Sequence, residues 1–443
     1  MMHTMEQLGS GALAGATYLR LSCGLQTVPD EVFDLADTLE ILDLSANALA
    51  SLPADFGRLR KLRILFCSDN LFTELPAVLG DCPDLGMIGF KANRISQVSP
   101  RALTPRLRWL ILTNNRIRTL PAEIGSCSLL QKLMLAGNEL TGIPESLANC
   151  HRLELLRLSA NQLQAFPQWL LTLPRLSWLA YAGNPFTADI EARAIAGAKV
   201  PDMAWADLQI DELLGEGASG VIHRARRADV EDRAIAVKVF KGAMTSDGTP
   251  ESECAAWVAA GRHPNLIAVN GKVAGHPLGR SGLVMELVDP LFRSLAGPPS
   301  FDTCTRDVYP ADAQFTLASV LRMASSVASV GRHLHECGIM HGDLYAHNIL
   351  HDGAGQVLLG DFGAASFYER CDPTAERLER LEVRAFGCLL EELIARCHDV
   401  DADADAVALL RHLKSECLAD EPKHRPSFSE LDRQLSDVSN VSN

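Results

Sequence analysis

The chain has 443 residues, of which 47% are hydrophobic and 22% are charged, and its formal net charge is −14. This length exceeds the size at which one hydrophobic core usually keeps growing, so we expect two domains, and the composition excludes wholesale disorder. The negative charge disfavours nucleic acid as a partner, and no apolar run approaches the roughly 18 residues of a membrane span, so we expect a cytoplasmic protein without a membrane span.

The first half of the chain is predicted to be a repeat array. Its segments follow the pattern L-x-x-L-x-L-x-x-N-x-L with a period of 22 or 23 residues. Such a period predicts a solenoid, in which each repeat is stable only when stacked on its neighbours. The leucines that open the segments are Leu39, Leu62, Leu85, Leu107, Leu130, Leu153 and Leu176. The asparagines expected to hydrogen-bond the backbone at the turns are Asn47, Asn70, Asn93, Asn115, Asn138, Asn161 and Asn184.

This pattern resembles the leucine-rich-repeat family over about Leu19 to Phe186. The resemblance implies that residues 1–195 form a leucine-rich-repeat solenoid, an α/β horseshoe with a concave face made by the strand positions between the leucines.

The expected concave face is unusually apolar. We predict an exposed hydrophobic patch there, and such patches usually mark an interaction site. Three readings remain open: a separate protein ligand, intramolecular docking against the second domain, and ordinary lateral packing of these side chains. The residues that we assign to this face are Ile64, Phe66, Met87, Trp109, Ile111, Met134 and Trp178.

The twelve cysteines include no C-x-x-C pair, which argues against a zinc cluster or a disulfide framework. Cys82, Cys127 and Cys150 each lie three positions before a leucine that opens a repeat. We interpret these cysteines as small apolar core residues with reduced thiols.

The second half begins with a glycine-rich hairpin, IDELLGEGASGVIHRARR, that contains Gly215, Gly217 and Gly220. Glycines at this spacing allow the backbone to approach phosphates without a side-chain clash. The β-rich segment AIAVKVF follows and contains Lys238, at the distance at which a kinase-like sheet places a phosphate-binding lysine.

Two further motifs carry the groups that phosphoryl transfer requires. HGDLYAHNIL contains Asp343 and, five residues later, Asn348, and LLGDFGAASF contains Asp361 within an intact D-F-G. A base beside the attacking hydroxyl, with an amide and a carboxylate to hold magnesium, is the arrangement that this chemistry uses.

Together the four motifs resemble the eukaryotic-like protein kinase family, over about Asp211 to Leu431. The resemblance implies a bilobal α+β catalytic domain at residues 205–443, ATP and Mg²⁺ as cofactors, and a protein substrate, with serine or threonine as the default acceptor. It makes Lys238 the phosphate-binding lysine and Asp343 the catalytic base. The implied magnesium ligands are Asn348 and Asp361.

The resemblance also implies a glutamate that orients Lys238. Glu253 is the first choice, but its distance from the following H-P-N motif leaves Glu251 open. LVMELV resembles the hinge strand that offers its backbone to adenine. The implied nucleotide-binding residues are Gly215, Gly217, Gly220, Ile222, Ala236, Lys238, Met285, Glu286, Val288 and Leu350.

The sequence departs from the kinase pattern at several positions. Gly342 replaces the arginine that would read a phosphorylated loop, Tyr345 replaces a lysine, and Glu382 stands where an aspartate is expected. The segment after D-F-G is short and lacks A-P-E, so we expect regulation other than loop phosphorylation. Besides an active protein kinase, a small-molecule kinase on the same fold and a pseudokinase scaffold remain open.

Overall fold

The structure is a computed structural model that divides into two compact units, Met1–Arg175 and Leu176–Asn443. No helix in the part of the chain that the structure describes is long and apolar enough to cross a membrane. The described residues are 2–197, 200–217, 219–227, 234–242, 244–245, 247–399 and 401–441.

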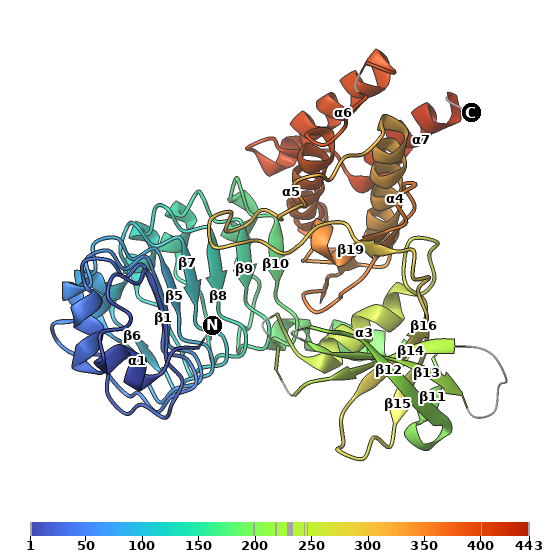
Figure 1. The fold of residues 1–443 in the computed structure, drawn as a ribbon. Helices are drawn as coiled ribbons and strands as arrows, with labels where there is room; N and C mark the ends of the chain where they lie inside the picture. The colour runs from blue at the N-terminus through green and yellow to red at the C-terminus, as the bar shows by residue number, and fades with distance from the viewer. Residues whose placement is uncertain are drawn as a thin grey trace. The chain divides into compact units, whose positions relative to one another are not determined.

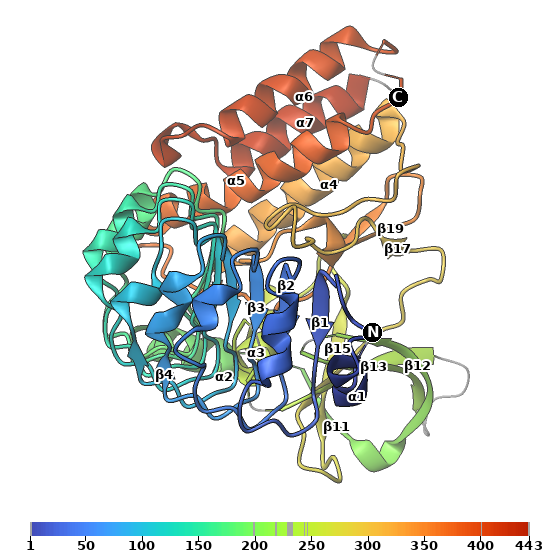
Figure 2. The same cartoon turned by 60° about the vertical axis from the view of Figure 1, so that its left-hand side comes forward.

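The first unit contains a parallel sheet in which every strand has three residues. Because the sequence period is nearly constant, equivalent repeat positions are in register, as Ile64 is with Met87 and Met87 with Trp109. Figure 2 shows the first three strands side by side. The strands, in spatial order, are β1 (Tyr18–Arg20), β2 (Ile41–Asp43), β3 (Ile64–Phe66), β5 (Met87–Gly89), β7 (Trp109–Ile111), β8 (Lys132–Met134) and β9 (Leu155–Arg157).

Short 3₁₀ helices, and not α-helices, follow most of these strands. A second, two-stranded parallel sheet consists of β4 (Glu74–Leu75) and β6 (Gln97–Val98), and α1 (Met5–Gly9) precedes β1. The 3₁₀ helices of the first unit are Asp30–Leu35, Phe56–Arg58, Ala77–Asp81, Pro100–Ala102, Ala122–Ser126, Glu145–Asn149 and Gln168–Thr172.

Side-chain amides join successive repeats, as predicted. Nδ2 of Asn138 donates to the carbonyls of Leu112 and Leu135, both at 2.9 Å, and its Oδ1 accepts from the Ile117 N–H at 3.0 Å. The side chain therefore satisfies three backbone groups that the strands leave unpaired.

The expected role of the repeat cysteines is confirmed. Cys82, Cys127 and Cys150 are all buried. Burial raises the pKa of the Cys127 thiol to about 12 and that of Cys150 to about 11, so both thiols are protonated at neutral pH.

The residues that we assign to the apolar face are partly covered. Ile64 and Met87 are only 5% and 4% exposed, and Phe66, Trp109, Ile111 and Met134 are half-buried. Neighbouring side chains cover one another: the Lys132 ammonium lies 4.5 Å from the centre of the Trp109 ring, and the Phe66 ring fills the space beside Gly89.

The second unit contains a six-stranded sheet with α3 (Pro250–Ala260) beside it (Figure 1). Strands β12, β13, β14 and β16 are joined by antiparallel pairing, and the order across the sheet is β11-β15-β16-β14-β13-β12. The strands are β11 (Asp202–Ala204), β12 (Leu208–Glu216), β13 (Gly220–Arg227), β14 (Ala234–Phe240), β15 (Val269–Ala274) and β16 (Gly282–Glu286).

Four long helices form the other part of this unit (Figure 1). They are α4 (Leu317–Glu336), α5 (Ala375–Ile394), α6 (Ala404–Cys417) and α7 (Phe428–Val441). The short strand β17 (Arg293–Ser294) precedes α4 in sequence. Between α4 and α5 lie the short strands β18 (Ile339–Met340), β19 (Ile349–His351), β20 (Val357–Leu359) and β21 (Ser366–Phe367).

The unit boundary differs from the expected limit of the repeats at residue 195. Strand β10 (Trp178–Ala180) and helix α2 (Ala188–Gly197) belong to the second unit. The reason is packing, because β10 contacts α5 and α2 contacts α3.

Candidate active site

A buried ion pair joins the sheet to α3. Lys238 on β14 is 6% exposed, Glu253 on α3 is 1% exposed, and their side chains are paired. The hydroxyl of Thr249 accepts from the N–H of Ser252 and caps the helix, which places Glu253 in its first turn. Glu251 is exposed, so the structure distinguishes between the two candidate glutamates.

The charge state of Lys238 follows from its surroundings. Burial alone would lower the pKa of the ammonium, but the carboxylates of Glu253 and Asp361 outweigh burial and raise it. The raised pKa favours the charged form of this buried ammonium.

The glycine-rich hairpin has room on its open side. The Gly217 N–H donates to the Gly220 carbonyl at 2.9 Å. A Cβ built on Gly215 or Gly217 would meet nothing within 4 Å, whereas one on Gly220 would lie 2.7 Å from the Val239 carbonyl oxygen. Gly220 is needed for packing, and the other two leave space for a ligand.

Strand register brings several expected nucleotide-binding residues together. Ile222 is in register with Lys238 and with Gly215, and Ala236 with Met285. Met285 is 5% exposed. These positions therefore lie on neighbouring strands of one sheet.

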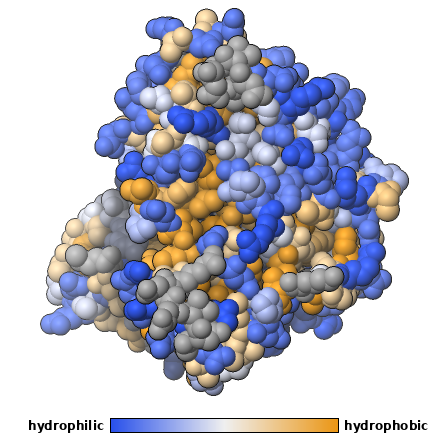
Figure 3. Space-filling view, turned by 90° about the vertical axis from the view of Figure 1, so that its right-hand side faces the viewer, coloured by the Kyte–Doolittle hydropathy of each residue, from blue (hydrophilic) through white to orange (hydrophobic). Residues whose placement is uncertain are grey.

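Two of the expected hinge residues, Glu286 and Val288, line a cavity of about 380 Å³ together with Leu266 and Leu358, whereas Met285 is not part of its lining. Leu350 lies on β19 in register with Leu358 and does not belong to this lining, nor does Ala236. On the face drawn in Figure 3, hydrophobic residues gather in the middle with hydrophilic residues around them.

The loop after β18 brings the expected base and an expected metal ligand together. Nδ2 of Asn348 donates to Oδ2 of Asp343 at 2.8 Å and to the Asp343 carbonyl at 2.9 Å. Nε2 of His341 lies 2.9 Å from the Gly360 carbonyl oxygen, which joins this loop to the D-F-G segment.

The D-F-G segment holds its aromatic ring inside and its carboxylate outside. Phe362 is fully buried, and its ring lies 4.4 Å from that of Trp257 and 5.0 Å from that of His341, between centroids. Asp361 is exposed, has a φ of +53°, and accepts from the Gly363 N–H at 3.1 Å.

The oxygens in this region suit a magnesium ion carried by phosphates. A Cβ on Gly363 would lie 3.2 Å from Oδ1 of Asp361 and 3.6 Å from Oε2 of Glu253, so the two carboxylates converge. Oε2 of Glu253 is buried without a hydrogen-bond partner among the described residues, and such an atom is costly unless a ligand or its water shell satisfies it.

Among the described residues, few side-chain oxygens in this region are available to bind a cation. Nδ2 of Asn348 donates to Asp343, so the side-chain oxygen of Asn348 is the atom that remains to bind a cation. Within the described ranges no three His, Cys, Asp or Glu residues gather as a metal site. Mg²⁺ commonly binds through one or two protein oxygens plus waters and substrate phosphates, so Asn348 and Asp361 fit this ion.

Glu382 on α5 holds the loop that carries Asp343. It is 2% exposed and accepts from the N–H groups of Gly342 at 2.6 Å and His341 at 3.2 Å, and one of its oxygens lies 2.8 Å from Nε2 of His335. Burial would raise the pKa of this carboxyl, but these partners outweigh it and lower the pKa. The glutamate therefore anchors the loop as an ionised group.

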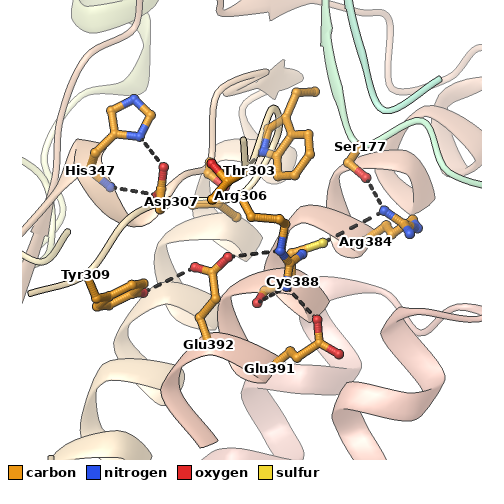
Figure 4. Close-up of polar contacts among 12 residues, drawn as sticks. Ser177, Thr303, Arg306, Asp307, Tyr309, His347, Arg384, Cys388, Glu391 and Glu392 are labelled. Atoms are coloured by element: carbon orange, nitrogen blue, oxygen red, sulfur yellow. Dashed lines mark hydrogen bonds and ion pairs between the residues drawn. The ribbon is translucent and has the colours of Figure 1, made fainter. Parts of the chain in front are cut away.

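A second anchor of the loop belongs to no sequence motif. The side chain of Asp307 has no accessible surface, and its oxygens lie 2.7 Å from Nδ1 of His347 and 3.0 Å from the backbone N of the same residue (Figure 4). Arg306 and Tyr309, on either side of Asp307, contact Glu392 of α5. The segment around Asp307 is thus fixed to α5 and holds the loop that carries Asp343 and Asn348.

Trp178, expected on the concave face of the repeats, lies in the second unit and is 1% exposed. Its ring stacks on that of Tyr345, two residues after Asp343.

Comparison with known proteins agrees with both halves of the sequence interpretation. The family model described as protein kinase domain matches residues 208–382, and that described as leucine rich repeat matches residues 105–163. Cyclin-dependent kinase 11A of Homo sapiens is 28% identical over 155 residues, which are 34% of this chain and 18% of that protein.

Two receptors are also similar. Ephrin type-B receptor 4 of Homo sapiens is 31% identical over 198 residues, 43% of this chain and 18% of the receptor. Ephrin type-A receptor 8 of Mus musculus is 30% identical over 198 residues, 44% of this chain and 17% of the receptor. The chain therefore spans less than a fifth of the length of these relatives.

Proposed function

We propose that this chain, in which a leucine-rich-repeat region precedes a protein kinase domain, is an ATP-dependent protein kinase. The observation that carries the proposal is the convergence of the Lys238–Glu253 pair with the exposed carboxylate of Asp361, next to the loop that joins Asp343 to Asn348. Phosphoryl transfer depends mainly on positioning and charge stabilisation, and these residues supply both.

Each residue has a distinct part in the proposed reaction. Lys238 donates to the α- and β-phosphates, and Glu253 keeps its ammonium in place. Asp343 orients the acceptor hydroxyl and takes its proton. Asn348 and Asp361 would hold Mg²⁺, which when bound neutralises the charge of the β- and γ-phosphates.

The acceptor is proposed to be a protein hydroxyl, with serine or threonine as the default. A small-molecule acceptor is the second candidate, because only residues 362–374 separate Asp361 from α5, too few for the usual peptide platform. The repeats are proposed to stack as a horseshoe that recruits a protein partner or acts on the kinase domain.

The test is transfer of labelled γ-phosphate from ATP in the presence of Mg²⁺. Purified full-length chain is incubated with mixed protein acceptors and, separately, with a panel of small-molecule alcohols and amines. Label in protein supports the proposal, label only in small molecules supports the second candidate, and nucleotide binding without transfer to either would indicate a pseudokinase.

A further inference from the structure

The segment 176–197 contacts the loop that carries the proposed base. The Trp178 and Tyr345 rings stack with centroids 4.1 Å apart and planes 8° from parallel, and the Trp178 indole N–H donates to the Leu344 carbonyl at 3.1 Å. Both rings are buried. Since Leu344 and Tyr345 directly follow Asp343, the Trp178 indole fixes the backbone next to the proposed base.

The same segment holds the chain that follows D-F-G. The backbone N–H of Tyr181 donates to the hydroxyl of Ser366 at 2.9 Å, and Ser366 is fully buried. Arg384 of α5 donates to the Ser177 hydroxyl at 2.9 Å (Figure 4). Strand β10 is therefore fastened on both sides, to the D-F-G segment and to α5.

A third contact reaches the helix that carries Glu253. Glu191 on α2 is 9% exposed. One of its oxygens accepts from the Gly183 N–H at 2.7 Å, and the other accepts from the Ser252 hydroxyl at 3.2 Å. Ser252 directly precedes Glu253, so Glu191 links the segment to the first turn of α3.

We propose that the segment 176–197 is the positioning element of the kinase domain, in which Trp178 sets the catalytic loop and Glu191 sets the first turn of α3. The inference builds on the proposed phosphoryl transfer and names the part that organises it. Neither residue contacts a reacting atom, so both are positioning residues.

This role explains how the short segment after D-F-G can suffice. Ser366 and Tyr368 are buried, and the Tyr368 hydroxyl donates to Glu379 at 2.7 Å. Phosphate cannot reach these hydroxyls without local unfolding. In the proposed arrangement, contacts from residues 176–197 replace a loop phosphate and hold the catalytic groups in position. The site is then organised without such a phosphate.

The experiment compares Trp178→Ala and Trp178→Leu with wild type in the full-length chain. It measures kcat, the KM for ATP, and hydrogen–deuterium exchange of residues 341–349. Leucine keeps much of the buried volume but removes both the ring stack and the N–H donor. We expect kcat to fall about 10- to 100-fold, as for a displaced catalytic group, with faster exchange of the loop and a KM for ATP within about twofold of wild type.

Glu191→Ala tests the other link. Loosening α3 should raise the KM for ATP and speed the exchange of residues 249–257, while the exchange of residues 341–349 stays close to that of wild type. Trp169→Ala is the matched control, a tryptophan of the first unit that should leave exchange in both regions unchanged.

Hydrogen–deuterium exchange is measured without catalysis, so the positioning role can be tested separately from the proposed function. An inactive wild type would count against the kinase proposal, while faster loop exchange in the Trp178 variants would still support positioning. A folded Trp178→Leu protein with wild-type kcat and wild-type loop exchange would overturn the inference. If Trp178→Ala does not fold, Trp178→Leu decides by the same two readouts.

Discussion

The replacement of Gly342 by alanine is expected to be strongly destabilising, although many protein kinases carry arginine there. Gly342 has a φ of +71°, and a Cβ on it would lie 2.5 Å from the Ala364 carbonyl oxygen and 2.7 Å from that of Leu179. The left-handed backbone costs a residue with a side chain about 1 to 2 kcal/mol. Overpacking against two fixed carbonyls adds about 1 to 3 kcal/mol.

The assay is urea unfolding of the full-length chain, in the region of the transition that reports on the second unit. Gly353→Ala is the matched control, because Gly353 has a φ of +83° but a Cβ on it would meet nothing within 4 Å. We expect the Gly342 variant to lose about 2 to 5 kcal/mol of unfolding free energy and the control only the backbone part, about 1 to 2 kcal/mol. Equal losses in the two variants would refute the crowding argument.

Three further predictions concern other parts of the chain. Asn138→Ala should lower the unfolding free energy of the repeats by about 2 to 4 kcal/mol in denaturant titration, because it leaves buried backbone groups unpaired; a loss below about 0.5 kcal/mol would contradict this. Burial raises the pKa of Glu392 to about 7, against the opposing effect of Arg306. Its stabilising contribution is therefore full below its unfolded pKa of about 4.5 and is lost as pH rises through about 7. Wild type should lose up to about 3 kcal/mol more than Glu392→Gln between pH 4.5 and 8, and parallel stability curves for the two proteins would oppose the assignment. Phosphatase treatment and Thr374→Ala should each leave kinase activity unchanged, because Ser366 and Tyr368 are buried and Gly342 offers no cation to bind a phosphate on the half-buried Thr374; loss of most activity in both would show that a loop phosphate is required.

The residues of the phosphoryl-transfer motifs could be identified from sequence because chemistry restricts both their types and their spacing. Lys238, Asp343 and Asp361 have few substitutes for the tasks that they perform. The choice between Glu251 and Glu253 required the structure, since it depends on where α3 begins, and the Thr249 cap sets that point.

Contacts between distant segments could not be predicted. Asp307 and His347 are 40 residues apart and belong to no common motif. Residues 176–195 continue the repeat pattern, which predicts that they belong to the repeats, but Trp178 stacks on Tyr345 and these residues belong to the second unit. The degree of exposure of the apolar face could not be predicted for a similar reason, since alternation along a strand does not reveal that neighbours such as Lys132 cover Trp109.

The most direct test of the proposed function is the single-turnover rate of γ-phosphate transfer from ATP to a protein acceptor, by wild type and by Asp343→Asn. Asparagine keeps the size of the side chain and removes the base, so we expect the rate to fall by about two to four orders of magnitude. ATP affinity, measured by calorimetry, should remain close to that of wild type. Transfer by Asp343→Asn at the wild-type rate, or a wild type that binds ATP but transfers no phosphate, would contradict the account.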